Sequence, residues 1–198
     1  MKANSNTVLT VENTVLVPYK SEHVPIYHEW MKDPFLQEMT ASEPLSIEEE
    51  YEMQKSWAVD EAKCTFIIVS PDFESNRVGR SATFGGMIGD VNLYWNDHDD
   101  PHSAEIEVMI AESSARSTGH GKRALLGMMS YATTELETTS FVAKISQSND
   151  ASIGLFTKLG FEVQSVSEVF KEVTMVATAE ALAAVVGSIV VEVDAFEG

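Results

Sequence analysis

The sequence predicts an α/β fold in which a central sheet of about six or seven strands is flanked by about four helices. Three observations indicate this class: β-branched runs of strand length, amphipathic segments with helical spacing, and the alternation of the two along the chain. A length of 198 residues suits one domain with one hydrophobic core. We therefore expect a single fold to carry the function.

The expected strands are runs rich in β-branched and aromatic residues that end at turn residues. Within one of them, residues 104–111, polar and apolar residues alternate. This alternation places Glu105, Glu107 and Met109 on one face of a strand and the apolar residues between them on the other. The expected strands span residues 15–17, 65–69, 87–95, 104–111 and 141–145, with further strand material in 161–176.

The expected helices combine helical apolar spacing with start and stop signals. Ser46 and Glu49 have the spacing of a capping box, which predicts that a helix begins at residue 47. Asp33-Pro34 is expected to stop an earlier helix. The expected helices span residues 24–31, 47–60, 122–136 and 150–159, and residues 72–83 are expected to form a surface loop.

The two ends of the chain bear on location. Residues 179–198 are rich in Ala and Val and are compatible with a helix, an added strand or an ordered tail. Their longest uncharged apolar stretch, residues 181–191, is shorter than the roughly 20 residues that cross a bilayer. Residues 1–10 lack the basic and then apolar layout of a signal peptide. We expect no membrane partner and a cytoplasmic location.

The composition excludes several classes of partner. A net charge of −18 repels phosphate backbones, so we expect no nucleic acid, whereas an amine or a basic peptide is compatible with it. Cys64 is the only cysteine, which excludes an internal disulfide and suits a reducing compartment. The histidines have no ligand spacing, so we expect no metal. They are His23, His28, His98, His102 and His120.

One short motif carries chemistry. Residues 116–121 read R-x-x-G-x-G and lie between an expected strand and an expected amphipathic helix, where amides at the helix N-terminus point at an anion. Gly119 and Gly121 allow the backbone to approach phosphate oxygens and to adopt positive φ, and Lys122 and Arg123 can add charge. This arrangement suits a pyrophosphate.

The motif matches in full the [QR]-x-x-G-x-[GA] signature of the GNAT acetyltransferases, and the chain resembles that superfamily. The second signature of the superfamily is an Asn that leads into a helix with a Leu-Gly-Phe turn, and residues 149–161 contain it from Asn149 to Leu159-Gly160-Phe161. Here Asn149 can cap the helix and Gly160 can end it in the left-handed conformation. The resemblance implies a GNAT fold with a mixed sheet, acetyl-CoA as co-substrate and an amine as acceptor.

Four further segments, at residues 16–19, 27–31, 40–45 and 105–112, resemble the N-acetyltransferase 9 branch of the superfamily. The resemblance covers residues 1–178, which we take as the GNAT domain, with residues 179–198 as an extension. It implies that the acceptor is a protein or peptide amine, with tubulin as a candidate. We expect the protein to be a monomer or a weak dimer.

The resemblance also implies which residues hold the cofactor. The backbone of Val108, Met109 and Ile110 supports the acetyl group and the pantetheine arm, and Asn149 contacts that arm from the next crossover. Phe156 occupies the place where many GNAT enzymes carry a Tyr that protonates the leaving thiolate, and Phe cannot donate a proton. The amides of the pyrophosphate cradle are those of Arg116, Ser117, Thr118, Gly119, His120, Gly121 and Lys122.

Two carboxylates are candidates for the general base. Glu105 stands eleven residues before Arg116, a spacing that resembles the catalytic glutamate of GNAT histone acetyltransferases, and is the first choice. Glu107 lies on the same strand face and is a near-equal rival. Two carboxylates so placed can raise one another's pKa toward neutrality. The alternative for each is a strand residue that faces solvent.

Several alternative hypotheses for the function and for single residues stay open. Besides a protein acetyltransferase, the chain is compatible with an acyl-CoA or protein-binding module without useful turnover, favoured by Phe156, and with an acetyltransferase of small amines. His120 is expected to contact the cofactor or to be exposed. The segment 97–100, Asp-His-Asp-Asp, is expected to be a solvated turn. Three aromatic residues are expected to line the acceptor groove or to pack in the core: Tyr27, Trp30 and Trp57.

Overall fold

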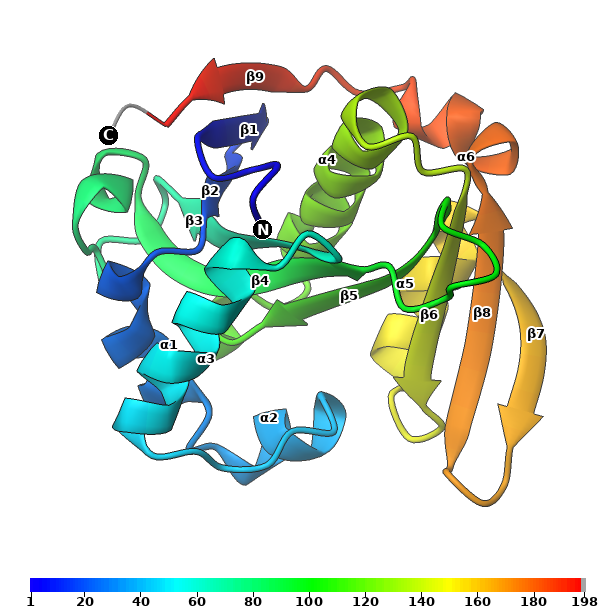
Figure 1. The fold of residues 1–198 in the computed structure, drawn as a ribbon, viewed down its shortest axis with the longest axis horizontal. Helices are drawn as coiled ribbons and strands as arrows, with labels where there is room; N and C mark the ends of the chain where they lie inside the picture. Colours follow the sequence, from blue (N-terminus) through cyan, green and yellow to red (C-terminus); the bar gives the residue numbers. More distant parts are fainter. Residues whose placement is uncertain (197–198) are drawn as a thin grey trace.

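The computed structural model describes residues 1–196, and a mixed sheet of nine strands forms the centre of that part of the chain (Figure 1). The strand order is β7-β8-β6-β5-β4-β3-β2-β1-β9, and only the β5–β6 pair is parallel. The strands are β1 (Thr7–Val11), β2 (Thr14–Pro18), β3 (Lys63–Ser70), β4 (Gly86–Tyr94), β5 (Ser103–Ile110), β6 (Ser140–Ser146), β7 (Glu162–Ser167), β8 (Glu172–Thr178) and β9 (Glu192–Ala195).

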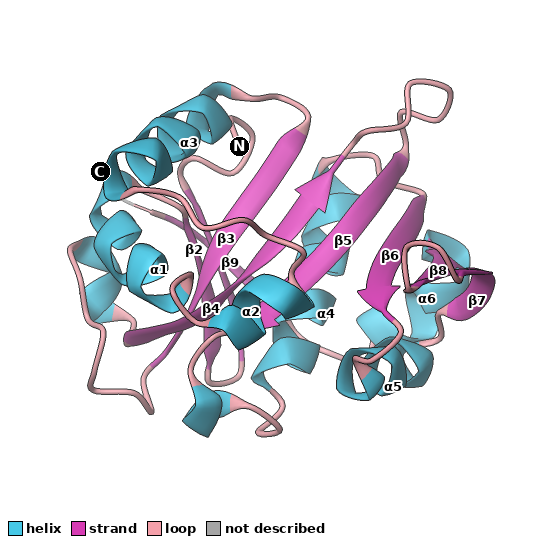
Figure 2. Ribbon diagram, turned by 90° about the horizontal axis from the view of Figure 1, so that it is seen from below, coloured by secondary structure: helices cyan, strands magenta, loops and turns pink. Residues whose placement is uncertain are grey.

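Six α-helices in the described residues cover the two faces of this sheet (Figure 2). Side chains of the first three helices share one buried cluster with one face of the central strands, and side chains of the last three share a second cluster with the other face. The helices are α1 (Val24–Trp30), α2 (Pro34–Met39), α3 (Ile47–Val59), α4 (His120–Glu135), α5 (Asp150–Leu159) and α6 (Ala179–Val186).

The predicted fold class and the predicted boundaries agree closely with this architecture. The capping box is confirmed, because the Ser46 side chain accepts from the Glu49 amide and the Glu49 carboxylate accepts from the Ser46 amide. Asn149 caps α5 through a bond from the Ser152 amide, and Gly160 ends that helix with a φ of 100°. Each of these local signals satisfies backbone groups at a helix end, which is why short-range sequence predicts them.

The predicted numbers of strands and helices were too low. The strand β1 was missed, because Thr7 and Thr10 dilute its apolar character and a tight turn joins it to β2. The pair Asp33-Pro34 was expected only to stop a helix. It also starts α2, because the Asp33 side chain accepts from the Phe35 amide and Pro34 occupies the first helical position.

The C-terminal segment forms both a helix and an added strand. Leu182 of α6 is buried in the cluster that contains α4, and β9 pairs antiparallel with β1, with Leu9 opposite Val193. The strand β9 therefore lies at the edge of the sheet next to β1, far from β7. Residues 197–198 of the predicted extension lie outside the described residues.

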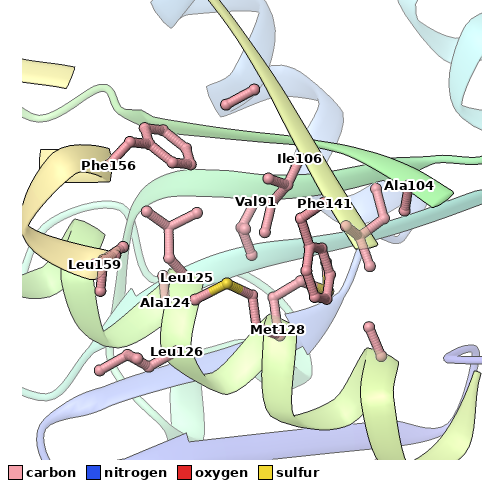
Figure 3. Packing of buried hydrophobic residues seen from close by; sticks show 14 of the residues in the cluster. Val91, Ala104, Ile106, Ala124, Leu125, Leu126, Met128, Phe141, Phe156 and Leu159 are labelled. Carbon is pink, nitrogen blue, oxygen red and sulfur yellow. The ribbon is translucent and has the colours of Figure 1, made fainter. Parts of the chain in front are cut away.

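The helix α4 anchors the central strands. Its Leu125 and Met128 are fully buried and lie against Val91 of β4 and Ile106 of β5, with Phe141 of β6 beside them (Figure 3). Burying a side chain of this size contributes about 1.5 to 3 kcal/mol. This packing holds β4, β5 and the beginning of β6 as one rigid unit beneath the cleft described next.

Candidate active site

A cleft opens where β5 and β6 separate. Their parallel register begins at Ser103 opposite Ser140 and stops at Glu105 opposite Val142, although both strands continue beyond this point. The cleft has a volume of about 640 Å³ and extends from this gap to the helices α1, α2 and α3. Its walls therefore include the second half of β5 as well as the start of α5.

The loop after β5 forms a turn with positive φ values at the start of α4. Ser117 and Gly119 have φ values of 62° and 93°, which reverse the chain so that the first turn of α4 follows directly. Across residues 1–196, no carbonyl or side chain accepts a hydrogen bond from the amides of residues 117–122. These amides and the positive end of the helix dipole suit a diphosphate.

The side chains in this loop hold the loop itself. Arg116 donates from Nε to the Ile110 carbonyl and from Nη2 to the Ala111 carbonyl, each at 2.9 Å. Its guanidinium also lies 5.0 Å from the centre of the Phe35 ring of α2. Thr118 Oγ1 donates to the Ala115 carbonyl at 2.7 Å. Arg116 thus fixes the end of β5, and the amides remain as the groups available for an anion.

His120 differs from the expectation for its side chain. The imidazole is buried, and its Nδ1 lies 2.8 Å from Thr14 Oγ1, which also accepts from Arg123 Nε at 2.9 Å. Burial lowers the pKa of His120, and the neighbouring Arg123 lowers it further. The side chain therefore ties α4 to the β1–β2 hairpin, and only the backbone amide of His120 faces the predicted cradle. The side chain of Lys122 is exposed, so it adds a positive charge to the surface at the start of α4.

Glu105 and Glu107 lie on the same face of β5 and both line the cleft. Their environments differ. Glu105 forms an ion pair with Lys144 of β6 at 2.7 Å. Burial raises the pKa of Glu107 to about 7, and repulsion from Glu105 and Asp90 adds to the shift. Glu107 is thus the cleft carboxylate that changes protonation near neutral pH.

Asp90 of β4 is a functional candidate that the sequence analysis missed. It is buried, lines the cleft and accepts hydrogen bonds from Tyr27 Oη at 3.2 Å and from Asn92 Nδ2 at 2.9 Å. Burial raises the pKa of Asp90 to about 6, although both of these bonds oppose the shift. A signal existed, because Asp90 and Asn92 interrupt an otherwise apolar strand at a spacing of two, which places both on one face.

All but one of the remaining predicted residues line the same cleft; Ile110 is the exception. Val108 and Met109 belong to its β5 wall, and Asn149 belongs to it at the start of α5. Ile110 packs with the α4 side of the core next to Gly121. Phe156 also lines the cleft and packs edge to face on Phe161 at 4.9 Å (Figure 3 shows its ring between α5 and β5).

The three aromatic residues of α1 and α3 were expected either to line the acceptor groove or to pack in the core, and both outcomes occur. Tyr27 and Trp57 line the cleft, and both also pack against Tyr19. Trp30 is buried and donates from Nε1 to Glu112 Oε1 at 2.8 Å, which ties α1 to the end of β5. The helices α1 and α3 are therefore fixed to the sheet by side chains that border the cleft.

Residues 1–196 lack two further kinds of feature. No group of three or more His, Cys, Asp or Glu side chains is placed to hold a metal ion. Among the helices described, none is both long enough and apolar enough to cross a bilayer.

Comparison with known proteins gives the class to which this fold and cleft belong. Residues 13–162 match the Acetyltransferase (GNAT) domain family. The chain therefore belongs to the GNAT acetyltransferase family and is an acetyl-CoA-dependent acetyltransferase, as the two sequence signatures predicted.

Within this family the chain is similar to N-acetyltransferase 9 proteins, which confirms the predicted branch. It is 53% identical to an N-acetyltransferase 9-like protein of Nematostella vectensis over 175 residues, which cover 88% of this chain and 87% of that protein. It is 52% identical to the alpha/beta-tubulin-N-acetyltransferase 9 of Homo sapiens over 177 residues, which cover 88% of this chain and 84% of that protein.

A solved structure confirms the fold. The spermidine N-acetyltransferase of Vibrio cholerae, in complex with CoA and spermine, superposes with a TM-score of 0.74 over 86% of this chain and 98% of that one. At 16% sequence identity, this likeness shows the fold alone.

Proposed function

We propose that this protein transfers the acetyl group of acetyl-CoA to an amine of another protein, by direct attack of the amine on the thioester. One observation carries the proposal: Glu107 lines a cleft along β5, where burial raises its pKa to about 7, and the same strand leads into a loop whose amides at residues 117–122 are unpaired. The amides suit the diphosphate of the coenzyme, and Glu107 suits the removal of a proton from the amine.

The residues present fit the coenzyme. A Cβ on Gly119 would lie 2.7 Å from Arg123 Nη1, so the glycine keeps this side of the loop open. Beyond Glu105, β5 is no longer paired with β6, which leaves room for an extended arm beside Val108. Residues 117–122 would hold the diphosphate, the second half of β5 and Asn149 would hold the arm, and the coenzyme supplies the activated acetyl group.

We assign the general base to Glu107 in preference to Glu105. An amine must lose a proton before it attacks, and a base works best when its pKa lies near the ambient pH. The carboxylate of Glu105 is already engaged by Lys144 at 2.7 Å, and this hydrogen bond raises the pKa of Lys144. Glu105 then acts on Glu107 by repulsion, which helps to keep the pKa of Glu107 near 7.

The leaving thiolate needs a proton that Phe156 cannot give. The cleft is open to solvent on its acceptor side, so water can supply this proton. Phe156 would then pack against the coenzyme instead of titrating, consistent with its edge-to-face contact with Phe161. The N–C bond to the acetyl group forms, the C–S bond breaks, and the proton of the amine passes to Glu107.

The acceptor is inferred from relatives and from charge. Three of the curated relatives carry the name alpha/beta-tubulin-N-acetyltransferase 9, which makes tubulin the first protein to test. The net charge of −18 and the carboxylates of the cleft favour a cationic acceptor. A cytoplasmic location and a monomeric or weakly dimeric state complete the proposal. Small amines are the alternative acceptor.

The test is release of coenzyme A thiol from acetyl-CoA in the presence of tubulin or of peptides with free amines. We expect thiol release to depend on the acceptor, and calorimetry to show coenzyme A binding. Binding without turnover would instead support the alternative of an acyl-CoA-binding module, which Phe156 favours. Turnover with polyamines and none with peptides or tubulin would support the small-amine alternative.

A further inference from the structure

Glu50 is a buried carboxylate in the wall of the cleft, on the α3 side. Three consecutive glutamates begin α3, and they have three different surroundings. Glu48 is exposed and Glu49 closes the capping box, whereas Glu50 turns inward and is only 2% exposed. Its side chain lines the same cleft as Glu107. The helix period thus delivers one carboxylate to the acceptor end of the site.

This carboxylate has no hydrogen-bond partner within residues 1–196. Its Oε2 is fully buried and accepts from no group there. The nearby titratable side chain is His28 of α1, whose Nδ1 lies 3.9 Å from Glu50 Oε1, too far for a hydrogen bond, and is itself without a partner. Burying a carboxylate without a partner costs free energy, so an unpaired buried carboxylate calls for an explanation. A ligand that brings a positive charge to Glu50 provides one.

The lysines of the cleft do not satisfy Glu50. Lys144 is paired with Glu105, Lys171 is paired with Glu168, and Lys63 lies over the Trp57 ring, 4.3 Å from its centre. Carboxylates predominate along the rest of the wall, so the potential near Glu50 is negative. The lining residues that carry a negative charge when ionised are Glu38, Glu43, Glu50, Asp90, Glu105, Glu107 and Glu172.

We propose that Glu50 binds a cationic side chain, Lys or Arg, of the acceptor protein, close to the amine that is acetylated. The inference rests on the proposed function and deepens it, because it assigns the residue that selects the acceptor. The reacting amine has to be neutral when it attacks and is deprotonated by Glu107. A permanently charged neighbour is therefore a separate group, and it supplies the donors that both oxygens of Glu50 lack.

A charge-assisted hydrogen bond of this kind sets the expected size of the effect. We expect kcat/KM for a peptide with Arg or Lys near its amino terminus to exceed that for its neutral counterpart by roughly tenfold to a hundredfold. The neutral counterparts are citrulline for Arg and norleucine for Lys, which keep length and shape. The cationic residue is moved through the first few positions of one otherwise neutral peptide, so that the preferred position is found.

The deciding variant is Glu50→Gln, with Glu52→Gln as the matched control. Glu52 lies on the same helix, is exposed and pairs with Lys55 on the surface, so its variant removes the same charge outside the cleft. We expect the ratio of cationic to neutral kcat/KM to fall toward one in Glu50→Gln, chiefly through KM, and to persist in Glu52→Gln. A ratio that persists in Glu50→Gln would overturn the inference.

The proposed function can fail separately from this inference. If the wild-type protein acetylates no peptide, the proposed function fails. If it acetylates cationic and neutral peptides equally well, only the role of Glu50 fails. Peptide binding to the CoA-loaded protein, measured by calorimetry, gives the same ratio without turnover. A preference for spermidine over every peptide would also overturn the inference, because the cation would then belong to a small amine.

A pH series adds an independent readout. Burial raises the pKa of Glu50, while His28 opposes the shift. The groups that face it from other elements are His28 and Tyr27 of α1 and Tyr19 after β2. As pH falls and Glu50 takes up a proton, we expect the cationic-to-neutral ratio to decline. Protonation of Glu107 slows both peptides alike and leaves the ratio unchanged, so a ratio that is constant with pH contradicts the assignment.

Discussion

The two parts of the proposed site, the loop after β5 and the carboxylate-lined cleft, are built from different materials. At the coenzyme end, the recognition groups are backbone amides at residues 117–122, and the surrounding side chains of Arg116 and Thr118 serve only to fix the loop. At the acceptor end, the groups are carboxylates on three different elements: half-buried Glu107 on β5 and the buried Asp90 on β4 and Glu50 on α3. One end depends on backbone conformation and the other on burial.

Because of this difference, different kinds of substitution impair the two parts of the site. A backbone site tolerates most changes of side chain but fails when a conformation with positive φ is lost. A site of buried carboxylates keeps its shape after an Asp→Asn or Glu→Gln change but loses its charge, because the cost of burial sets the pKa. The three predictions that follow separate these two modes.

The largest effect is expected for Glu107→Gln. We expect kcat to fall by roughly a hundredfold to ten-thousandfold, because a positioned general base contributes that much. Coenzyme A binding, measured by calorimetry, should be unchanged. In the wild type, kcat/KM should fall as pH drops below about 7, since Glu107 must be ionised to accept a proton.

Glu105→Gln is the matched control for that variant. It removes a repulsive neighbour, so the pKa of Glu107 should fall and the acid limb of the pH profile should move to lower pH. Most of kcat should remain at high pH. A collapse of activity in Glu105→Gln together with normal activity in Glu107→Gln would reverse the two roles.

The next effect is expected for Gly119→Val, which tests the backbone end. A β-branched residue at a φ of 93° is strained, and its Cβ would meet Arg123 Nη1. We expect the affinity for coenzyme A to fall by roughly tenfold to a hundredfold, as 1 to 3 kcal/mol of strain implies. Gly121→Ala is the control, because its Cβ would make an ordinary 3.6 Å contact with Ile110. Equal affinities for the two variants would contradict a backbone site.

The smallest effect is expected for Asp90→Asn, read as thermal stability. The pKa of Asp90 rises from 3.8 to about 6 on folding, so the folded state gains stability when the carboxyl is protonated and loses it as pH rises through about 6. The variant should therefore melt several degrees higher than the wild type near pH 8, and at about the same temperature as the wild type near pH 4.

Asp99→Asn, in the exposed β4–β5 turn, should shift the melting temperature at neither pH. Asp90→Asn should also lower the pKa of Glu107, because Asp90 contributes to the repulsion that raises it. A variant that melts lower at pH 8 would show that the bonds from Tyr27 and Asn92 outweigh the cost of burying the charge.

The backbone end of the site could be predicted from sequence, and the acceptor end could not. The motif at residues 116–121 and the cap at Asn149 are local, because a few consecutive residues determine a turn and the helix that follows it. The alternation in β5 likewise predicted that Glu105 and Glu107 share a face, and the register confirms it. Which of the two carboxylates is the better candidate for the general base depends on burial, and the spacing of residues in the sequence does not reveal burial.

The missed features are those that need tertiary structure. The pKa of Asp90 depends on Tyr27, which is 63 residues earlier in the chain. The lack of a hydrogen-bond partner for Glu50 depends on the distance between α3 and α1. In the sequence, Glu50 is one of three consecutive glutamates, and this run indicated only a capping box. The edge strand β9 depends on β1, because a short segment of this kind is stable only when paired, and β1 is itself held between β2 and β9.

The early end of the β5–β6 register has a consequence for the whole molecule. Only a short stretch of main-chain pairing joins the two halves of the sheet, from Ser103 to Glu105. A ligand bound in the gap between β5 and β6 would contact both halves of the sheet, and its binding free energy would add to the free energy of unfolding. The lifetime of the protein against heat and proteolysis should then follow the supply of acetyl-CoA, which would couple its abundance to metabolism.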